Sequence, residues 1–238
     1  MRYLKYKHIG LVAMVTLLLA CGGDRFQKSK LDELILELPQ GRIFSVILHD
    51  MDVQGNFFET YHHQYHIIQE AQSGDVGDYT TGWLEVGKRE FNQHVNDMGM
   101  ELAARDSTGK LNKSVAPAGY NNYVGNTKYG RWENRGGSSF WAFYGQYAFM
   151  SSMFRMMAHP VHRSYYRDWR GGYYGTGRSY YGPVSGGSSY YGTNSAYGRG
   201  ANPNSSWSRN RSAFKQRVAS RTSRSSGGLR SRGGSFGK

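Results

Sequence analysis

The hydrophobic pattern of residues 29–38 predicts a short amphipathic helix. Apolar side chains recur there at spacings of three and four residues, as one face of a helix requires: Leu31, Leu34, Ile35 and Leu38. Ser29 and Asp32 have the spacing of a capping box at the start of this helix. Pro39 and Gly41, which follow directly, are typical of a helix end.

Residues 42–52 and 57–69 are rich in β-branched and aromatic side chains, which favours strands. The sequence VQGN at 53–56 separates them and has the composition of a turn, so the pair predicts a β-hairpin. Alternation along the second strand divides its side chains between two faces. One face carries Phe57, Tyr61, Tyr65 and Ile67, and the other carries Thr60, His62, Gln64 and His66.

A second helix is predicted within residues 82–99. Phe91, Val95 and Met98 suit one helix face, and Gly99 stands where the glycine that follows a helix is commonly found. The sequence MELAARDSTGKL at 100–111 then indicates a strand and a turn. Together these elements predict an α+β fold for residues 24–113, with one hairpin, two short helices and a single modest core.

The pattern changes beyond this domain. Residues 114–139 are rich in Gly, Asn and Tyr, which is typical of a linker, and residues 140–158 are strongly apolar and aromatic. We expect 140–158 to form an aromatic apolar helix that interacts with the membrane at its interface. Two alternatives stay open. The stretch could pack on the domain or on a partner, or its 19 residues could just cross a bilayer as a helix.

The remaining residues, 159–238, form a tail rich in Tyr, Gly, Ser and Arg. From residue 163 onward it contains three aliphatic core-forming residues, which is too few to offset the entropy of ordering, so we expect disorder. Charge is divided in the same place. Residues 22–162 hold 13 Lys and Arg and 16 Asp and Glu, whereas residues 163–238 hold 14 Lys and Arg and one acid.

The amino terminus has the form of an export signal. Residues 1–8 are basic, and residues 9–20 are short, uncharged and mostly apolar. This segment ends in Leu18-Leu19-Ala20-Cys21, which resembles the lipobox of bacterial lipoproteins.

The resemblance implies that residues 1–20 are a signal peptide and that residues 21–23 form a lipid-anchor segment. Lipid would be attached to Cys21, the one cysteine of the chain, which therefore has no partner for a disulfide within it. The residue after the cysteine is Gly22 and not Asp. In hosts with two membranes, this resembles the pattern of lipoproteins that are sorted to the outer membrane.

Clustered histidines at 62, 63 and 66, with His49 and Asp50 on the neighbouring strand, raise the alternative of a metal-binding or enzymatic envelope module. Its main candidate residues are His49, His62 and His66. His62 and His66 share a strand face, but four residues along a strand span about 13 Å, which is too far for both to bind one zinc ion. His49 on the neighbouring strand would have to complete such a site. We assign no catalytic, cofactor-binding or metal residue, and we expect neither a cofactor nor enzymatic activity.

The sequence therefore predicts a lipid-anchored, extracytoplasmic envelope lipoprotein with a structural or interaction role. Its basic tail is expected to bind anionic envelope polymers or lipids, since each Lys or Arg near an anionic surface contributes about 1 kcal/mol. The tail also has the composition of single-stranded nucleic-acid binders, although an exported tail is not expected to meet nucleic acid. In the alternative, residues 140–158 span the bilayer, and the tail is a cytoplasmic adaptor for nucleic acid or inner-leaflet lipid.

Overall fold

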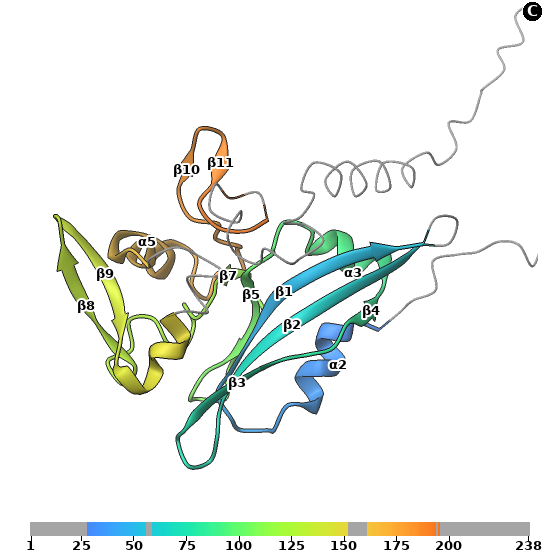
Figure 1. The fold of residues 1–238 in the computed structure, drawn as a ribbon, viewed down its shortest axis with the longest axis horizontal. Coiled ribbons are helices and arrows are strands. Elements are labelled where there is room, and N and C mark those ends of the chain that lie inside the picture. Colours follow the sequence, from blue (N-terminus) through green and yellow to red (C-terminus); the bar gives the residue numbers. More distant parts are fainter. Residues whose placement is uncertain (1–27, 56–58, 152–160, 194, 196–238) are drawn as a thin grey trace, which may run out of the picture.

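An antiparallel sheet forms the centre of the molecule (Figure 1). The computed structural model describes residues 28–55, 59–151, 161–193 and 195. The strands of this sheet are β1 (Phe44–Gln54), β2 (Thr60–Glu70), β3 (Val76–Thr80), β4 (Leu84–Val86), β5 (Met100–Arg105), β6 (Leu111–Asn112) and β7 (Ala116–Pro117). Their order is β3-β2-β1-β5-β6, with β4 paired to β2 and β7 paired to β5.

The predicted helix at the start of the domain is confirmed as α2 (Lys30–Glu37). The Ser29 hydroxyl accepts a hydrogen bond from the backbone N–H of Asp32 at 3.3 Å, as the capping pattern indicated. The second helix, α3 (Lys88–Gln93), is shorter than predicted, because turns follow it and reach Gly99, whose φ is +74°.

The predicted hairpin is also confirmed. Strands β1 and β2 pair antiparallel from Phe44 opposite Gln69 to Gln54 opposite Thr60, with an irregularity at His49. Side chains alternate between the two faces of the hairpin. On one face, Val46 and Leu48 belong to the main core, which also contains the buried residues of α2. On the opposite face, a separate cluster joins the sheet to later parts of the chain: Ile47, Ile68, Ala118, Tyr123, Tyr129, Tyr147 and Met150.

The prediction of a linker at residues 114–139 is wrong. Tyr120, Tyr123 and Tyr129 are at most 1% exposed, and Tyr120 and Val124 belong to the main core. The segment then enters a second hairpin, β8 (Gly130–Arg135) and β9 (Ser138–Phe143), in which Trp132 pairs with Trp141. The turn between them is Gly136-Gly137, with φ of +55° and +79°. A two-residue hairpin turn of this kind favours glycine at both positions.

The prediction of one helix over residues 140–158 is also wrong. Its first part is strand β9, followed by the 3-10 helix η1 (Gly145–Tyr147) and helical residues at 148–151. Trp141 and Met150 are buried in the domain, which is the packed alternative. None of the helices in the described ranges is both long and apolar enough to span a membrane. Residues 152–160 lie outside the described residues.

Disorder throughout the tail is the third prediction that the structure corrects. Residues 161–193 contain α5 (Arg163–Gly172) and the short hairpin β10 (Val184–Ser185) and β11 (Ser188–Ser189). Trp169, Tyr180 and Tyr191 are at most 5% exposed and pack in the main core. Large aromatic rings thus bury enough apolar area to order a segment that has almost no aliphatic residues. The rest of the tail, 196–238, lies outside the described residues.

Candidate functional site

Two of the three candidate histidines lie together. The ring centroids of His49 and His66 are 6.0 Å apart. His66 Nδ1 lies 2.8 Å from Thr80 Oγ1, and its Nε2 lies 3.1 Å from Asp78 Oδ2. His62 lies four residues away along β2, opposite Asp52. In the described part of the chain, no three His, Cys, Asp or Glu side chains are placed to hold a metal ion, so the geometry gives no support to the metal alternative.

A different pair of histidines belongs to a buried polar network. His63 is fully buried, and its Nδ1 lies 3.0 Å from the Tyr65 hydroxyl. Burial, together with the neighbouring His94, lowers the pKa of His63 to about 3. His94 Nδ1 lies 2.8 Å from Asp97 Oδ2, and the Tyr181 hydroxyl donates to Asp97 Oδ1 at 2.6 Å. The rings of His63 and His94 are in contact, with centroids 6.3 Å apart. This contact and the hydrogen bonds together link β2, the turn after α3 and the segment after α5.

The histidine pattern indicated His63 only as a candidate metal ligand, and nothing in the sequence pointed to His94, Asp97 or Tyr181. His63 lies on the same strand face as Tyr61 and Tyr65, which predicts burial but not a polar partner. Its neighbours in the network come from positions 31 and 118 residues further along the chain, namely His94 and Tyr181. Exposed fractions of 0% for His63 and 1% for Asp97 place these groups inside the core, where they fix the packing of the three segments.

Glu90 connects α3 to the beginning of α2. Its carboxylate accepts hydrogen bonds from the Ser29 hydroxyl at 2.9 Å, from the Lys30 N–H at 2.9 Å and from the Leu31 N–H at 3.0 Å. The first N–H groups of a helix have no partner within the helix, and a negative charge there is stabilised by the helix dipole. Glu90 therefore completes the cap that Ser29 begins.

Replacing Glu90 with Ala is expected to lower the free energy of unfolding by about 2–3 kcal/mol, because buried donors lose a charged acceptor. Urea unfolding followed by far-UV circular dichroism measures the change. The matched control is Glu37→Ala, an exposed carboxylate at the other end of α2. Equal effects of the two substitutions would show that the Glu90 cap does not contribute to stability.

A second buried carboxylate belongs to Glu101 in β5. It is fully buried and accepts hydrogen bonds from the Gly119 N–H at 3.1 Å and from the Asn121 side-chain amide. Burial raises the pKa of Glu101 to about 7, although hydrogen bonds from Ser45 and Asn121 act in the opposite direction. Glu101 is thus a titratable group at the junction between the sheet and the segment that follows β7.

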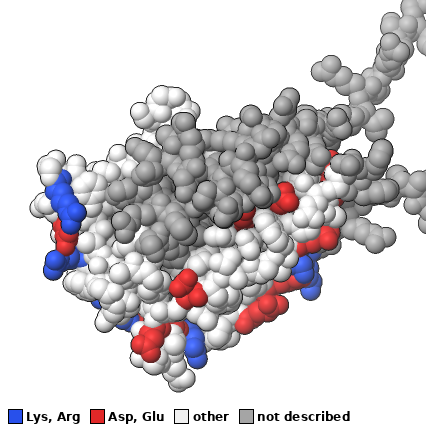
Figure 2. All heavy atoms as spheres, in the orientation of Figure 1, with Lys and Arg blue, Asp and Glu red and all other residues white. Residues whose placement is uncertain are grey.

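The surface of the C-terminal elements carries a group of exposed arginines, here called the arginine set: Arg131, Arg135, Arg163, Arg167, Arg170 and Arg178. The acids among the described residues from 114 onward are Glu133 and Asp168. By contrast, residues 28–113 hold eight Lys and Arg and fourteen Asp and Glu. Figure 2 shows basic side chains, with an acidic one between them, at the end of the molecule formed by β8 and β9, and acidic side chains with some basic ones along the sheet.

Aromatic rings support three members of the arginine set. The guanidinium carbon of Arg163 lies 5.8 Å from the Trp132 ring centroid, and that of Arg178 lies 4.8 Å from the Tyr173 centroid. The contact of Arg170 is closer, at 3.9 Å from the ring of Tyr174. Such cation–π contacts hold a guanidinium in place while its N–H groups stay available to solvent or to a ligand.

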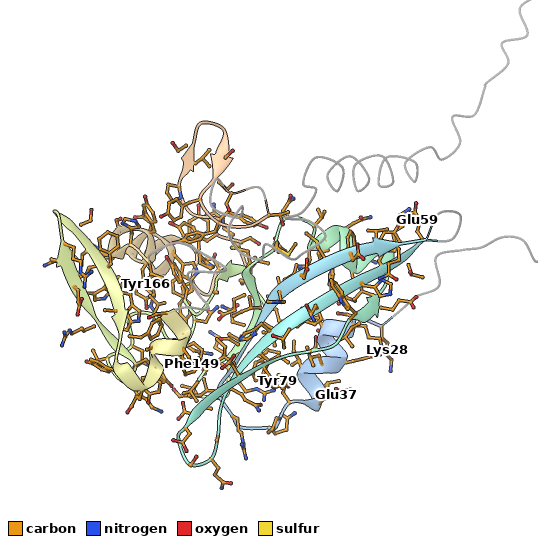
Figure 3. All side chains as sticks on the ribbon, viewed as in Figure 1. Lys28, Glu37, Glu59, Tyr79, Phe149 and Tyr166 are labelled. Atoms are coloured by element: carbon orange, nitrogen blue, oxygen red, sulfur yellow. The ribbon has the colours of Figure 1, made fainter. Side chains whose placement is uncertain are left out.

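The supporting rings form a continuous layer under the arginines. Tyr166 lies between α5 and the β8–β9 hairpin (Figure 3), with its ring centroid 5.7 Å from Trp132 and 5.5 Å from Trp169. Tyr120 lies 5.4 Å from both Tyr166 and Trp169. Arg163, Arg170 and Arg178 are therefore displayed on aromatic rings that pack against the main core.

Cys21, the residue on which the resemblance to lipoproteins depends, lies outside the described residues, which begin at Lys28. The structure therefore describes the surface that the chain offers but not the segment expected to be its anchor. Comparison of the chain with protein-family models, with curated proteins and with solved structures finds no match.

Proposed function

We propose that this protein is a lipid-anchored lipoprotein of the bacterial cell envelope with a structural or interaction role. In this proposal lipid on Cys21 holds the chain at the membrane, and the arginine set together with the tail binds an anionic, phosphate-bearing envelope surface. The observation that supports it best is the exposed arginine set, three members of which rest on packed aromatic rings. Arginine suits this role because its planar guanidinium forms paired hydrogen bonds with phosphate oxygens.

The division of charge supports an orientation for this binding. The part of the domain formed by residues 28–113 has more acids than bases, so an anionic surface repels it. The C-terminal elements attract the same surface, and residues 196–238 add ten Lys and Arg without a single acid. At about 1 kcal/mol for each basic residue near an anionic surface, several residues together give stable binding.

The length of the chain between anchor and domain supports the same arrangement. Seven residue steps separate Cys21 from Lys28, the first described residue. At a maximum of about 3.6 Å for each residue, this segment reaches at most about 25 Å. An anchored domain would therefore stay close to the membrane, where its arginine set can contact phosphate groups.

Membrane fractionation tests both parts of the proposal. The native chain is expected to stay with the membranes in 1 M salt, because acyl chains hold it and salt at that concentration reduces the Debye length to about 3 Å. The comparison chain has Cys21→Ser and an ordinary cleavable export signal in place of residues 1–20. It is expected to bind at low salt through its arginines and to be released by 1 M salt.

A variant of the comparison chain with Arg163→Gln and Arg167→Gln is expected to leave the membranes at a lower salt concentration. The matched control has Lys28→Gln and Arg89→Gln, two basic residues of the acidic half, and is expected to behave like its parent. Salt release of the native chain would contradict the lipid anchor. Release of the comparison chain at every salt concentration would contradict the role of the arginines.

A further inference from the structure

A small pocket lies where three distant segments of the chain meet. Its wall is formed by the β5–β6 turn, by the residues around Asn121 and by the loop after α5, and its volume is about 250 Å³. Ligand pockets for drug-sized molecules commonly have about 300–1,000 Å³ and mostly apolar walls. This pocket is smaller, so it fits a ligand about the size of a single ring.

The wall of the pocket combines polar and apolar surface in similar amounts. Its polar side chains supply amide, hydroxyl, carboxylate and ammonium groups: Asp106, Lys110, Asn112, Ser114, Asn121 and Tyr174. In the loop after α5, Gly175 and Gly177 have no side chain that covers the backbone, and the position of a Cβ at each is open space. A wall of this kind selects a ligand that offers many hydrogen-bonding groups.

Two of the amide side chains are held in fixed orientations. Asn112 Nδ2 donates to Asn121 Oδ1 at 2.8 Å, while the Ser114 N–H donates to Asn112 Oδ1 at 3.0 Å. The amide nitrogen of Asn121 donates to the buried carboxyl group of Glu101. These bonds fix which end of each amide is donor and which is acceptor, so binding does not have to order them.

The wall excludes two other classes of ligand. Lys110 is the one basic residue of the wall and stands beside Asp106, so the pocket lacks the excess positive charge that a phosphate requires. An aromatic base needs an open ring to stack on. The Tyr174 ring already contacts the Arg170 guanidinium at 3.9 Å and the Trp169 ring at 5.2 Å, so less of its surface is left for stacking.

We infer that this pocket is a binding site for one neutral sugar unit. Its size of about one ring, its several neutral hydrogen-bonding groups and its balanced charge match a polyhydroxylated ring and none of the excluded classes. The sugar can be free, or it can be one unit of a glycan chain. The inference does not depend on the membrane anchor, because the site lies wholly within the folded residues.

Nuclear magnetic resonance titration of the soluble chain tests the inference. The protein is the full chain without residues 1–20 and with Cys21→Ser, and the probes are glucose, N-acetylglucosamine and the linear tetramer of N-acetylglucosamine. At least one probe is expected to give saturable shifts of the backbone N–H signals of Gly175 and Gly177. Tighter binding of the tetramer than of the monomer identifies a glycan chain as the source, and equal binding identifies the free sugar.

Two substitutions locate the binding. Tyr174→Phe removes the hydroxyl while keeping the ring, and Asn112→Ala removes a fixed amide, and each is expected to weaken binding about fivefold through the loss of hydrogen bonds. The matched controls are Tyr173→Phe and Asn134→Ala, which lie outside the pocket wall and are expected to keep the native affinity. If Asn112→Ala fails to fold, Tyr174→Phe decides alone.

Three results would overturn the inference. The first is the absence of saturable shifts with every sugar probe, and the second is native affinity in both pocket variants. The third is stronger binding of glycerol 3-phosphate or adenine at the same residues, which would assign the pocket to one of the excluded classes.

Discussion

Replacing Trp169 with Ala is expected to lower the free energy of unfolding of the whole domain by about 3–5 kcal/mol. Trp169 is 2% exposed, and its ring centroid lies 5.4 Å from Tyr120 and 5.2 Å from Tyr174. Removing the indole leaves a cavity in the layer that joins α5 to the main core. Because this layer and the sheet share one core, the loss is expected to appear in the unfolding of β1 and β2 as well.

Urea unfolding followed by far-UV circular dichroism measures this change, and amide signals of β1 report on the sheet separately. The matched control is Trp83→Ala, because Trp83 is 43% exposed and its removal leaves no enclosed cavity. An unchanged midpoint for the sheet in the Trp169→Ala protein would contradict the shared core. In that case, residues 161–193 would unfold as an independent unit.

The sequence predicted those elements whose burial depends on aliphatic side chains at regular spacings. Helix α2 follows from its leucines and isoleucine, and the β1–β2 hairpin follows from runs of β-branched residues. Strand β5 was predicted as well, although all six of its residues are buried and no single buried face exists. For α2, local spacing was enough to indicate both the helix and its buried face.

The predictions of a linker and of disorder in the C-terminal half are wrong because tyrosine, tryptophan and glycine replace aliphatic residues in its core. Judged by composition alone, such a segment is typical of disordered chains. In the structure, however, each buried ring contributes a large apolar area, and glycine lets the rings approach the backbone. A Cβ added at Gly125 would stand 2.7 Å from the Tyr166 ring. Glycine is therefore needed there for packing, and it does not mark a flexible linker.

The candidate sites depend on contacts between residues far apart in the chain. Glu90 caps a helix that begins 60 residues earlier, and Tyr181 donates to a carboxylate 84 residues earlier. Spacing along the sequence contains no information on such pairs. The aromatic and basic composition of the tail did point to an arginine-rich surface, but its position on a folded layer emerged from the structure.

Glu101→Gln is expected to change the pH dependence of stability. The pKa of Glu101 is raised to about 7 in the folded protein, against an ordinary value near 4.5, so the folded state binds more protons between these values. Its contribution to stability is therefore present below about pH 4.5 and is lost as the pH rises through about 7. With about 1.4 kcal/mol for each pH unit, the loss amounts to about 3 kcal/mol.

His63 acts with the opposite sign. Its pKa is lowered to about 3 from an ordinary value of 6.5, so the unfolded state binds more protons between these values. Its contribution is present above about pH 6.5 and is lost as the pH falls towards 3. Between about pH 4.5 and 6.5 the contributions of Glu101 and His63 to the free energy of unfolding therefore change in opposite directions and offset each other.

The comparison of Glu101→Gln with the native chain separates these two effects. Gln cannot ionise, so the difference in unfolding free energy is expected to move by about 3 kcal/mol in favour of the variant between about pH 4 and 8. Urea unfolding at each pH measures it, with Glu85→Gln, an exposed carboxylate on β4, as the matched control. Parallel profiles for the native chain and Glu101→Gln would contradict a carboxyl group that is protonated on burial. A divergence that begins near pH 4.5 and ends near pH 7 would assign the proton to Glu101, since His63 is present in both chains and its contribution cancels.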